Sequence, residues 1–307
     1  MKPGKLSMLA IINPVSRHGK GAQAGYRVLP DLKEKFALKV VESEGPGHIR
    51  SITSTEEGYD VFLICGGDGS VHEAVNGIMQ RAGKKPVLAY LPVGSGNDSA
   101  RACGIPFNLK KAVQVINSFK VRKIDIGRMN TVYYSNSLGI GLDGMVAYRA
   151  AELRKKVKLK GVPLYLRALY DVIINWEPFR LTAWSDGNKI YEYSTMLAAF
   201  NIGRSYGGGF FVTPRAFIDD GLLDFCIVRE IPKHEVPLRL PFFIAGKYEW
   251  MGIALAGRAK HVKVESSRPV IAQLDGETYS IVEADIEIIP EAIEVVISEK
   301  AFLARMT

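Results

Sequence analysis

The sequence predicts an α/β domain with a parallel sheet, followed by a second domain that is an all-β sandwich. Up to about residue 120, short apolar runs alternate with helical patterns, which is typical of a parallel sheet covered by helices. From residue 121 onward, strand-length segments separated by turn residues predominate, which favours a sandwich. A length of 307 residues also favours two domains over one. We place the boundary near residues 122–130, giving domains 1–125 and 126–297.

The first domain is expected to open with a strand at residues 9–12. A helix over residues 25–36 should bend or split at Pro30, because proline lacks an N–H group and clashes with the preceding turn. Further strands are expected at residues 38–42, 61–65 and 87–91. Because parallel strands point the same way, the loops that follow them should gather at one edge of the sheet.

Two glycine-rich loops follow strands in this domain, GGDGS at 66–70 and PVGSGNDSAR at 92–101. Small residues let backbone N–H groups approach a phosphate, and a helix N-terminus favours negative charge there. Each loop carries an aspartate, Asp68 and Asp98. A carboxylate beside a phosphate requires a cation, which suggests Mg²⁺. Each loop alone also fits a tight strand-to-helix turn with the aspartate as a cap; two such loops favour nucleotide binding.

Several other classes are disfavoured. No GxxxxGK[ST] motif occurs, and no GxGxxG motif is followed by an acidic residue about twenty positions later, so neither a P-loop nor a dinucleotide fold is supported. A net charge of +8 suggests an acidic partner, but no nucleic-acid-binding motif accompanies it. The three cysteines are far apart, which argues against zinc and disulfides and favours a reducing cytoplasm; Cys65 and Cys226 fit core positions.

The second domain is expected to contain a series of short strands. They are predicted at residues 122–129, 132–138, 181–185, 189–199, 223–228, 261–265, 281–289 and 293–297. A helical insertion at about 144–174 interrupts them and is rich in basic residues interleaved with apolar ones: Arg149, Arg154, Lys155, Lys156, Lys158, Lys160 and Arg167. Such a segment fits a peripheral contact with an anionic membrane, or a solvated helix face. No transmembrane helix is expected, because Lys247 and Glu249 interrupt the most apolar later region.

The order of motifs along the chain is more specific than any one of them. The motifs are, in order, GGDGS with VHEAVNG, PVGSGNDSAR, KIDIGRMN, SLGIGLDGMV, FNIGRSYGGGFFVTPRAFIDDGLLDFCIV and QLDGE. Together they resemble the bacterial soluble diacylglycerol kinases over nearly the whole chain. The resemblance implies a phosphofructokinase-like ATP-binding domain and a β-sandwich that completes the cleft. It also implies that the tail 298–307 returns to the first domain, giving Phe302 and Leu303 a docking site.

The resemblance implies a cytoplasmic lipid kinase that uses ATP and Mg²⁺ and meets its substrate at the membrane surface. The product expected from diacylglycerol is phosphatidic acid; a homodimer is left open. The residues implied for the nucleotide are Asn13, Ser43, Gly66, Gly67, Asp68, Gly69, Ser70, Gly94, Ser95 and Gly96. Those implied for a water-mediated magnesium network are Asp68, Asp98 and Asp125, and those for a structural magnesium are Phe217, Asp220 and Leu222.

The resemblance implies that the acidic pair in LDGE, Asp275 and Glu277, activates the acceptor hydroxyl. We take Asp275 as the base, with Glu277 orienting it or sharing the role. The same four residues also fit a β-hairpin turn. The family commonly has threonine where this chain has Ser43, Ser70 and Ser95, so the hydroxyl is kept and a methyl is lost. The alternatives are a kinase for another lipid alcohol or a soluble acceptor, and a non-catalytic nucleotide- or lipid-binding regulator.

Overall fold

The computed structural model describes residues 4–157, 159, 162–299 and 301. The chain forms two compact units, Met1–Ile124 together with Glu291–Thr307, and Asp125–Pro290. The C-terminal segment therefore belongs to the first unit from Glu291 onward, earlier than the predicted residue 298. The docking predicted for Phe302 and Leu303 lies outside the described residues.

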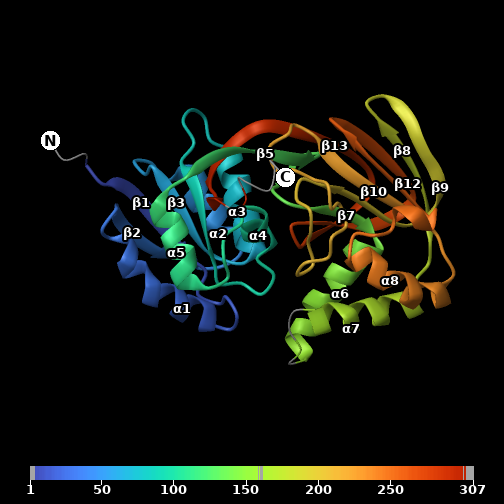
Figure 1. Ribbon diagram of the computed structural model, residues 1–307, viewed down its shortest axis with the longest axis horizontal. Coiled ribbons are helices and arrows are strands. Elements are labelled where there is room, and N and C mark those ends of the chain that lie inside the picture. Colours follow the sequence, from blue (N-terminus) through green and yellow to red (C-terminus); the bar gives the residue numbers. More distant parts are fainter. Residues whose placement is uncertain (1–3, 158, 160–161, 300, 302–307) are drawn as a thin grey trace. The chain divides into compact units, whose positions relative to one another are not determined.

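The sheet of the first unit is parallel (Figure 1). Its strands are β1 (Leu6–Ile12), β2 (Phe36–Glu42), β3 (Val61–Gly66) and β4 (Val87–Pro92), in the order β4-β3-β1-β2. The end of β13 (Glu277–Val296) joins β4 in parallel, with Val295 opposite Leu88. Every residue of β3 is buried, as expected for a central strand covered on both faces.

The helices of the first unit follow its strands. They are α1 (Lys20–Val28), the 3₁₀ helix η1 (Leu29–Leu32), α2 (His48–Thr55), α3 (Asp68–Met79), α4 (Asp98–Ala102) and α5 (Leu109–Ser118). The helix predicted at residues 25–36 begins and ends earlier, and it splits before Pro30, which occupies the 3₁₀ turn. Helix α3 begins at Asp68, so three of the five predicted loop residues form its first turn.

The second unit is mainly antiparallel. Its remaining strands are β5 (Val121–Met129), β6 (Val132–Tyr134), β7 (Leu138–Gly141), β8 (Phe179–Ser185), β9 (Asn188–Asn201), β10 (Leu223–Arg229), β11 (Ala254–Ala259) and β12 (His261–Leu274). The main order is β11-β10-β9-β7-β12-β13; β8 pairs with both β9 and β12, and β5 pairs with β6 and β13. Strands β5 and β13 each run from one unit into the other. Strand β11 was not predicted.

The predicted helical insertion is present as α6 (Leu142–Lys156) and α7 (Val162–Ile174), with Lys158 and Lys160 outside the described residues. An unpredicted helix, α8 (Val236–Ile244), lies between the 3₁₀ helices η2 (Lys233–Glu235) and η3 (Glu249–Met251). Figure 1 shows α6, α7 and α8 along the same side of this unit's strands. None of the helices in the described part of the chain has both the length and the apolarity needed to cross a bilayer.

The core of the second unit is continuous from the strands to the helices. Phe179, Phe200 and Ile286 from the strands join Leu164 and Ala168 from α7 in one buried cluster.

All three cysteines are buried thiols, in agreement with the core positions predicted for two of them. Burial raises the pKa of Cys103 and Cys226 to about 12, so both stay protonated at neutral pH.

Candidate active site

Asp68 connects the two glycine-rich loops of the first unit. Its Oδ1 accepts hydrogen bonds from the backbone N–H groups of Asp98 (2.7 Å) and Ser99 (3.3 Å), and its Oδ2 accepts one from Asn97 (2.8 Å). The carboxylate at the start of α3 therefore holds the first turn of α4. Glu73, on the same helix, does the same for α2 by accepting from the N–H groups of Gly47 and Ile49. Hydrogen bonds to Asp68 thus join the two predicted phosphate loops to each other.

The glycines of both loops are required by their close approach. A Cβ on Gly94 would lie 2.2 Å from the Cα of Gly67, and one on Gly96 would lie 2.5 Å from Oδ2 of Asp68. A Cβ on Gly66 would lie 2.4 Å from the side chain of Ser70. No side chain fits at these separations, so the loops present backbone to their surroundings, as a phosphate-binding surface requires.

The other residues predicted for the nucleotide lie on the same loops or next to them. Asn13 donates through Nδ2 to the buried Ser70 Oγ (3.0 Å), which joins the end of β1 to the first turn of α3. Ser43 is also buried, and its N–H bonds to the carbonyl of Ile12 (2.8 Å). Ser95 is exposed at the second loop. The structure therefore gathers the predicted nucleotide residues at the C-terminal ends of β1, β2, β3 and β4, where α/β sheets bind ligands.

The predicted magnesium carboxylates each have a protein partner. Asp98 is buried and forms an ion pair with Arg101, three residues later on α4. Asp125 is buried in the second unit, where its Oδ2 accepts from the N–H of Gly221 (2.6 Å). No cluster of three or more His, Cys, Asp or Glu side chains suited to a metal occurs among the described residues. A carboxylate already engaged with N–H donors fits an ion held through water better than one held directly.

The predicted structural magnesium concerns the segment from Phe217 to Leu222, next to Asp125. Asp220 accepts from the N–H of Leu222 (3.2 Å) and lies 3.6 Å from the guanidinium of Arg258, which also bonds Asp224. A positive charge is therefore already present beside the only carboxylate of this predicted site. The structural magnesium stays a prediction.

LDGE forms a two-residue hairpin between β12 and β13. Asp275 has φ of 49° and Gly276 φ of 94°, the pair of positive values that a type I′ turn requires. Asparagine and aspartate followed by glycine are the preferred residues at these positions. The hairpin reading of LDGE is thus correct, and the two acidic side chains are presented by a tight turn.

The Asp275 carboxylate is buried and surrounded by donors. Oδ2 accepts from the N–H (2.7 Å) and the hydroxyl (3.2 Å) of Ser135, and Oδ1 accepts from the N–H groups of Asn136 (3.0 Å) and Ser137 (2.9 Å). Burial raises the pKa of Asp275, and the three backbone donors act in the opposite direction. Glu277, by contrast, is exposed. The two acidic residues of LDGE are therefore in different environments, and Asp275 holds the loop at 135–137.

Two further side chains fix this turn and were not predicted. Gln273 accepts from the N–H of Gly276 through Oε1 (2.9 Å), and its Nε2 donates to Asp143 (3.1 Å) on the first turn of α6. Asp143 thus orients the amide that holds the turn. The contact between Gln273 and Asp143 joins residues 130 positions apart, so no local pattern could reveal it. Their signal in the sequence is the presence of polar residues inside the apolar segments GLDGMV and IAQL.

Asp143 gives the second unit a stability that depends on pH. Burial raises its pKa from 3.8 to about 6, against hydrogen bonds from Gln273 and Tyr206. Because the folded pKa is the higher one, the stabilising contribution is full below about pH 4 and is lost as pH rises through about 6. Relative to Asp143→Asn, the wild type should lose of the order of 2 kcal/mol between these limits, allowing for partial exposure. Thermal melting of both proteins from pH 4 to 8 measures this; parallel curves would contradict it.

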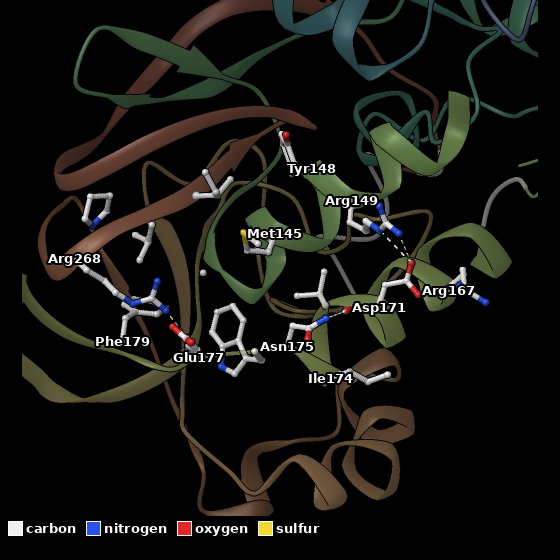
Figure 2. A pocket seen from close by; sticks show the side chains of 16 residues that line it. Met145, Tyr148, Arg149, Arg167, Asp171, Ile174, Asn175, Glu177, Phe179 and Arg268 are labelled. Atoms are coloured by element: carbon white, nitrogen blue, oxygen red, sulfur yellow. Dashed lines mark hydrogen bonds and ion pairs between the residues drawn. The ribbon is translucent and has the colours of Figure 1, made fainter. Parts of the chain in front are cut away.

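The second unit also contains a cavity of about 660 Å³ (Figure 2). It is lined by α6, α7, the start of β8 and the bulge of β12, with Met145, Trp176, Phe179 and Ile271 among its apolar walls. Its polar lining consists of three arginines together with Asp171, Asn175 and Glu177. Figure 2 shows Arg149 directed at Asp171, which lies 2.9 Å from the Nε of Arg167 as well. The pocket is thus apolar within and carries paired charges on α6 and α7.

Comparison with known proteins assigns the chain to a protein family. Residues 7–129 match the model of the diacylglycerol kinase catalytic domain, and residues 136–297 match that of the YegS C-terminal NAD kinase beta sandwich-like domain. The chain belongs to the diacylglycerol kinase family. The two-domain kinase fold predicted from the sequence is confirmed, with a β-sandwich-like second domain.

Alignments with similar members of the diacylglycerol kinase family cover most of the chain. A diacylglycerol kinase of Mycobacterium tuberculosis is 28% identical over 297 residues, which are 93% of each protein. One from Staphylococcus carnosus is 26% identical over 274 residues, 87% of each. A Bacillus anthracis structure assigned to the diacylglycerol kinases is 25% identical, with a TM-score of 0.81 and coverage of 98% and 99%. An NAD kinase of Archaeoglobus fulgidus solved with ATP shares the fold, with a TM-score of 0.54, 12% identity and 97% coverage of each chain.

Proposed function

We propose that the protein is an ATP- and Mg²⁺-dependent lipid kinase that transfers the γ-phosphoryl group to the hydroxyl of diacylglycerol, giving phosphatidic acid. The names of the relatives support the kinase and its substrate class. The observation that carries the lipid part is the apolar pocket, whose volume of about 660 Å³ lies within the range of small-molecule sites. A soluble, highly polar acceptor would gain nothing from such walls.

The pocket and the LDGE turn share two neighbouring strands. On β12, Ile271 lines the pocket and Asp275 follows four residues later, about 13 Å along an extended strand. On β7, which pairs with β12, Gly141 lines the pocket, and Ser137, the residue just before β7, donates to Asp275. An acyl chain in the pocket would therefore run along both strands toward the turn, and the glycerol hydroxyl would lie near the acidic pair.

Trp176 supports a ligand of mixed polarity. The indole ring lines the pocket, and its buried N–H finds no hydrogen-bond acceptor in the described part of the chain. A buried donor without a partner costs about 1–3 kcal/mol. An ester carbonyl of a diacylglycerol would satisfy this donor while the acyl chain covers the ring.

In the proposed reaction, the backbone N–H groups of the two glycine loops hold the nucleotide phosphates. The acceptor hydroxyl oxygen attacks the γ-phosphorus, the bond to the β–γ bridging oxygen breaks, and ADP leaves. We propose Glu277 as the group that takes the hydroxyl proton, because it is exposed while Asp275 is committed to four hydrogen bonds. Asp275 then acts by holding the loop at 135–137. The proposal thus makes Glu277 the base and Asp275 the supporting residue, the reverse of the roles taken from the sequence.

Magnesium enters the proposal as a partner of the nucleotide. Asp68, Asp98 and Asp125 would hold it through water, since their carboxylates already contact N–H groups or arginine. The ion would neutralise phosphate charge as the bond to ADP breaks.

A panel of acceptors tests the proposed function. The protein is incubated with radiolabelled ATP, Mg²⁺ and detergent micelles containing diacylglycerol, monoacylglycerol or a sphingoid base, and separately with NAD. We expect label in diacylglycerol, identified by mass as phosphatidic acid. Label in NAD alone, or in none of the lipids, would overturn the proposal.

A variant of the pocket tests where the acyl chain lies. Val270→Phe places a larger side chain into the cavity from β12. We expect KM for long-chain diacylglycerol to rise about tenfold with kcat unchanged, because the lost contact is the same in ground and transition states. Val282→Phe, at an exposed position of β13, is the matched control. An unchanged KM in the Val270 variant would place the chain elsewhere.

A further inference from the structure

Helix α7 is apolar on two opposite sides. Leu164, Ala168 and Val172 follow each other at four-residue spacing and pack into the core. Leu166, Tyr170 and Ile174 have the same spacing, but their exposed fractions are 40%, 62% and 53%. An amphipathic surface helix normally places polar residues on its outer side. The outer side of α7 is therefore an apolar stripe without a covering element among the described residues.

A second set of exposed apolar side chains lies on the neighbouring helices. Leu238 and Phe242, four residues apart on α8, are 72% and 40% exposed, and Trp250 on η3 is 69% exposed. The rings of Phe242 and Trp250 are perpendicular, with centroids 5.2 Å apart. Lys233, just before α8, donates to the carbonyl of Ile174 (2.9 Å), so the end of α7 lies beside η2 and α8 (Figure 1).

We call these six residues the apolar helical face: Leu166, Tyr170, Ile174, Leu238, Phe242 and Trp250. Single exposed apolar residues are common, but a gathering of large ones on adjacent helices marks an interaction surface. Tryptophan and phenylalanine beside leucine are the composition of helices that lie in a bilayer interface. The face is thus suited to partial burial among lipid headgroups and acyl chains.

Charge favours a lipid surface over a second copy of the chain. The segment 142–174 contains seven basic residues and three acidic ones in sequence. Figure 2 shows that two of these basic residues, Arg149 and Arg167, lie beside the pocket. Two copies meeting at this face would bring like charges together, which opposes association. Both arginines pair with Asp171, but the segment keeps an excess of positive charge, which an anionic bilayer would attract.

We propose that the apolar helical face docks on an anionic lipid bilayer, and that the acyl-chain pocket opens at this docked surface. Ile174 belongs to both the face and the pocket lining, and Tyr148, another pocket residue, is also exposed. A lipid can then pass from the bilayer into the pocket without crossing water. The role given to the pocket rests on the proposed lipid kinase function. The docking itself does not depend on that function.

Vesicle flotation tests the docking. The wild type should float with vesicles of equal parts phosphatidylcholine and phosphatidylglycerol, and its tryptophan emission, to which Trp250 contributes, should shift to shorter wavelength. The double variant Leu238→Ser/Trp250→Ser should partition at least about tenfold less, because two large apolar side chains are lost. Phe107→Ser, an exposed aromatic residue of the first unit, is the control and should float like the wild type. Tyr170→Ser provides an independent variant on α7.

The readouts separate docking from catalysis. Activity of the double variant on short-chain diacylglycerol dispersed in water should match that of the wild type, while activity on vesicles falls with binding. If no lipid is phosphorylated by any protein but only the face variants stop floating, the docking stands and the proposed function fails. Equal flotation of wild type and both face variants would overturn the docking. Loss of a dimer in light scattering, with flotation unchanged, would also overturn it and assign the face to self-association.

Discussion

Glu277→Gln is expected to reduce kcat for lipid phosphorylation by about 10²- to 10⁴-fold, the range typical of losing a general base. The melting temperature should stay the same, because the side chain is exposed and the amide has the same shape. Binding of ATP should also stay the same, since Glu277 lies on the hairpin of the second unit and the glycine loops lie in the first.

Asp275→Asn is the matched comparison and should behave differently. The asparagine would direct an NH₂ group at N–H donors that the carboxylate now satisfies. We expect a loss of about 2–4 kcal/mol in the free energy of unfolding, together with reduced activity. Denaturant melts and initial rates of both variants decide the assignment. If Asp275→Asn were stable and inactive while Glu277→Gln stayed active, Asp275 would be the base.

Gly94→Ala is expected to weaken ATP binding by about 100-fold or more, the scale at which a misplaced binding loop acts. The added Cβ would lie 2.2 Å from the Cα of Gly67, which is backbone and cannot rotate away. The two loops must therefore separate, and their N–H groups would no longer converge on one set of phosphates. Binding of a fluorescent ATP analogue measures the effect directly.

Gly45→Ala is the matched control for this loop variant. Gly45 also lies in a loop after a strand of the first unit, but nothing lies within 4 Å of its added Cβ. ATP binding by Gly45→Ala should equal that of the wild type. Equal binding by Gly94→Ala would show that the contact between the loops does not shape the nucleotide site.

The strands of the first unit and the hairpin at Asp275-Gly276 could be predicted because their signals are local. Apolar runs bounded by glycine mark β3 and β4, and the dipeptide Asp-Gly specifies a type I′ turn. Strand β11 was missed because ALAGRA contains no β-branched or aromatic residue. Helix α8 was missed because Pro241 lies inside it.

The contacts of the predicted site residues could not be derived from the sequence. The sequence placed Asp68 and Asp275 among the functional residues, yet both carboxylates hold loops through backbone N–H groups. The donors to Asp275 come from residues about 140 positions earlier. Hydrogen bonds at that separation depend on the tertiary fold, which local periodicity does not encode. For the same reason Gln273 and Asp143 were not found.

The pairing of Val295 with Leu88 has a consequence for how the chain acquires its structure. The sheet of the first unit contains a strand segment that follows the entire second unit in sequence. During synthesis, the ribosome must make more than two hundred further residues before this segment can pair with β4. Contacts of such sequence separation slow folding. The first unit therefore cannot be completed before the second has been synthesised, and a chain that ends at residue 125 lacks one strand of that sheet.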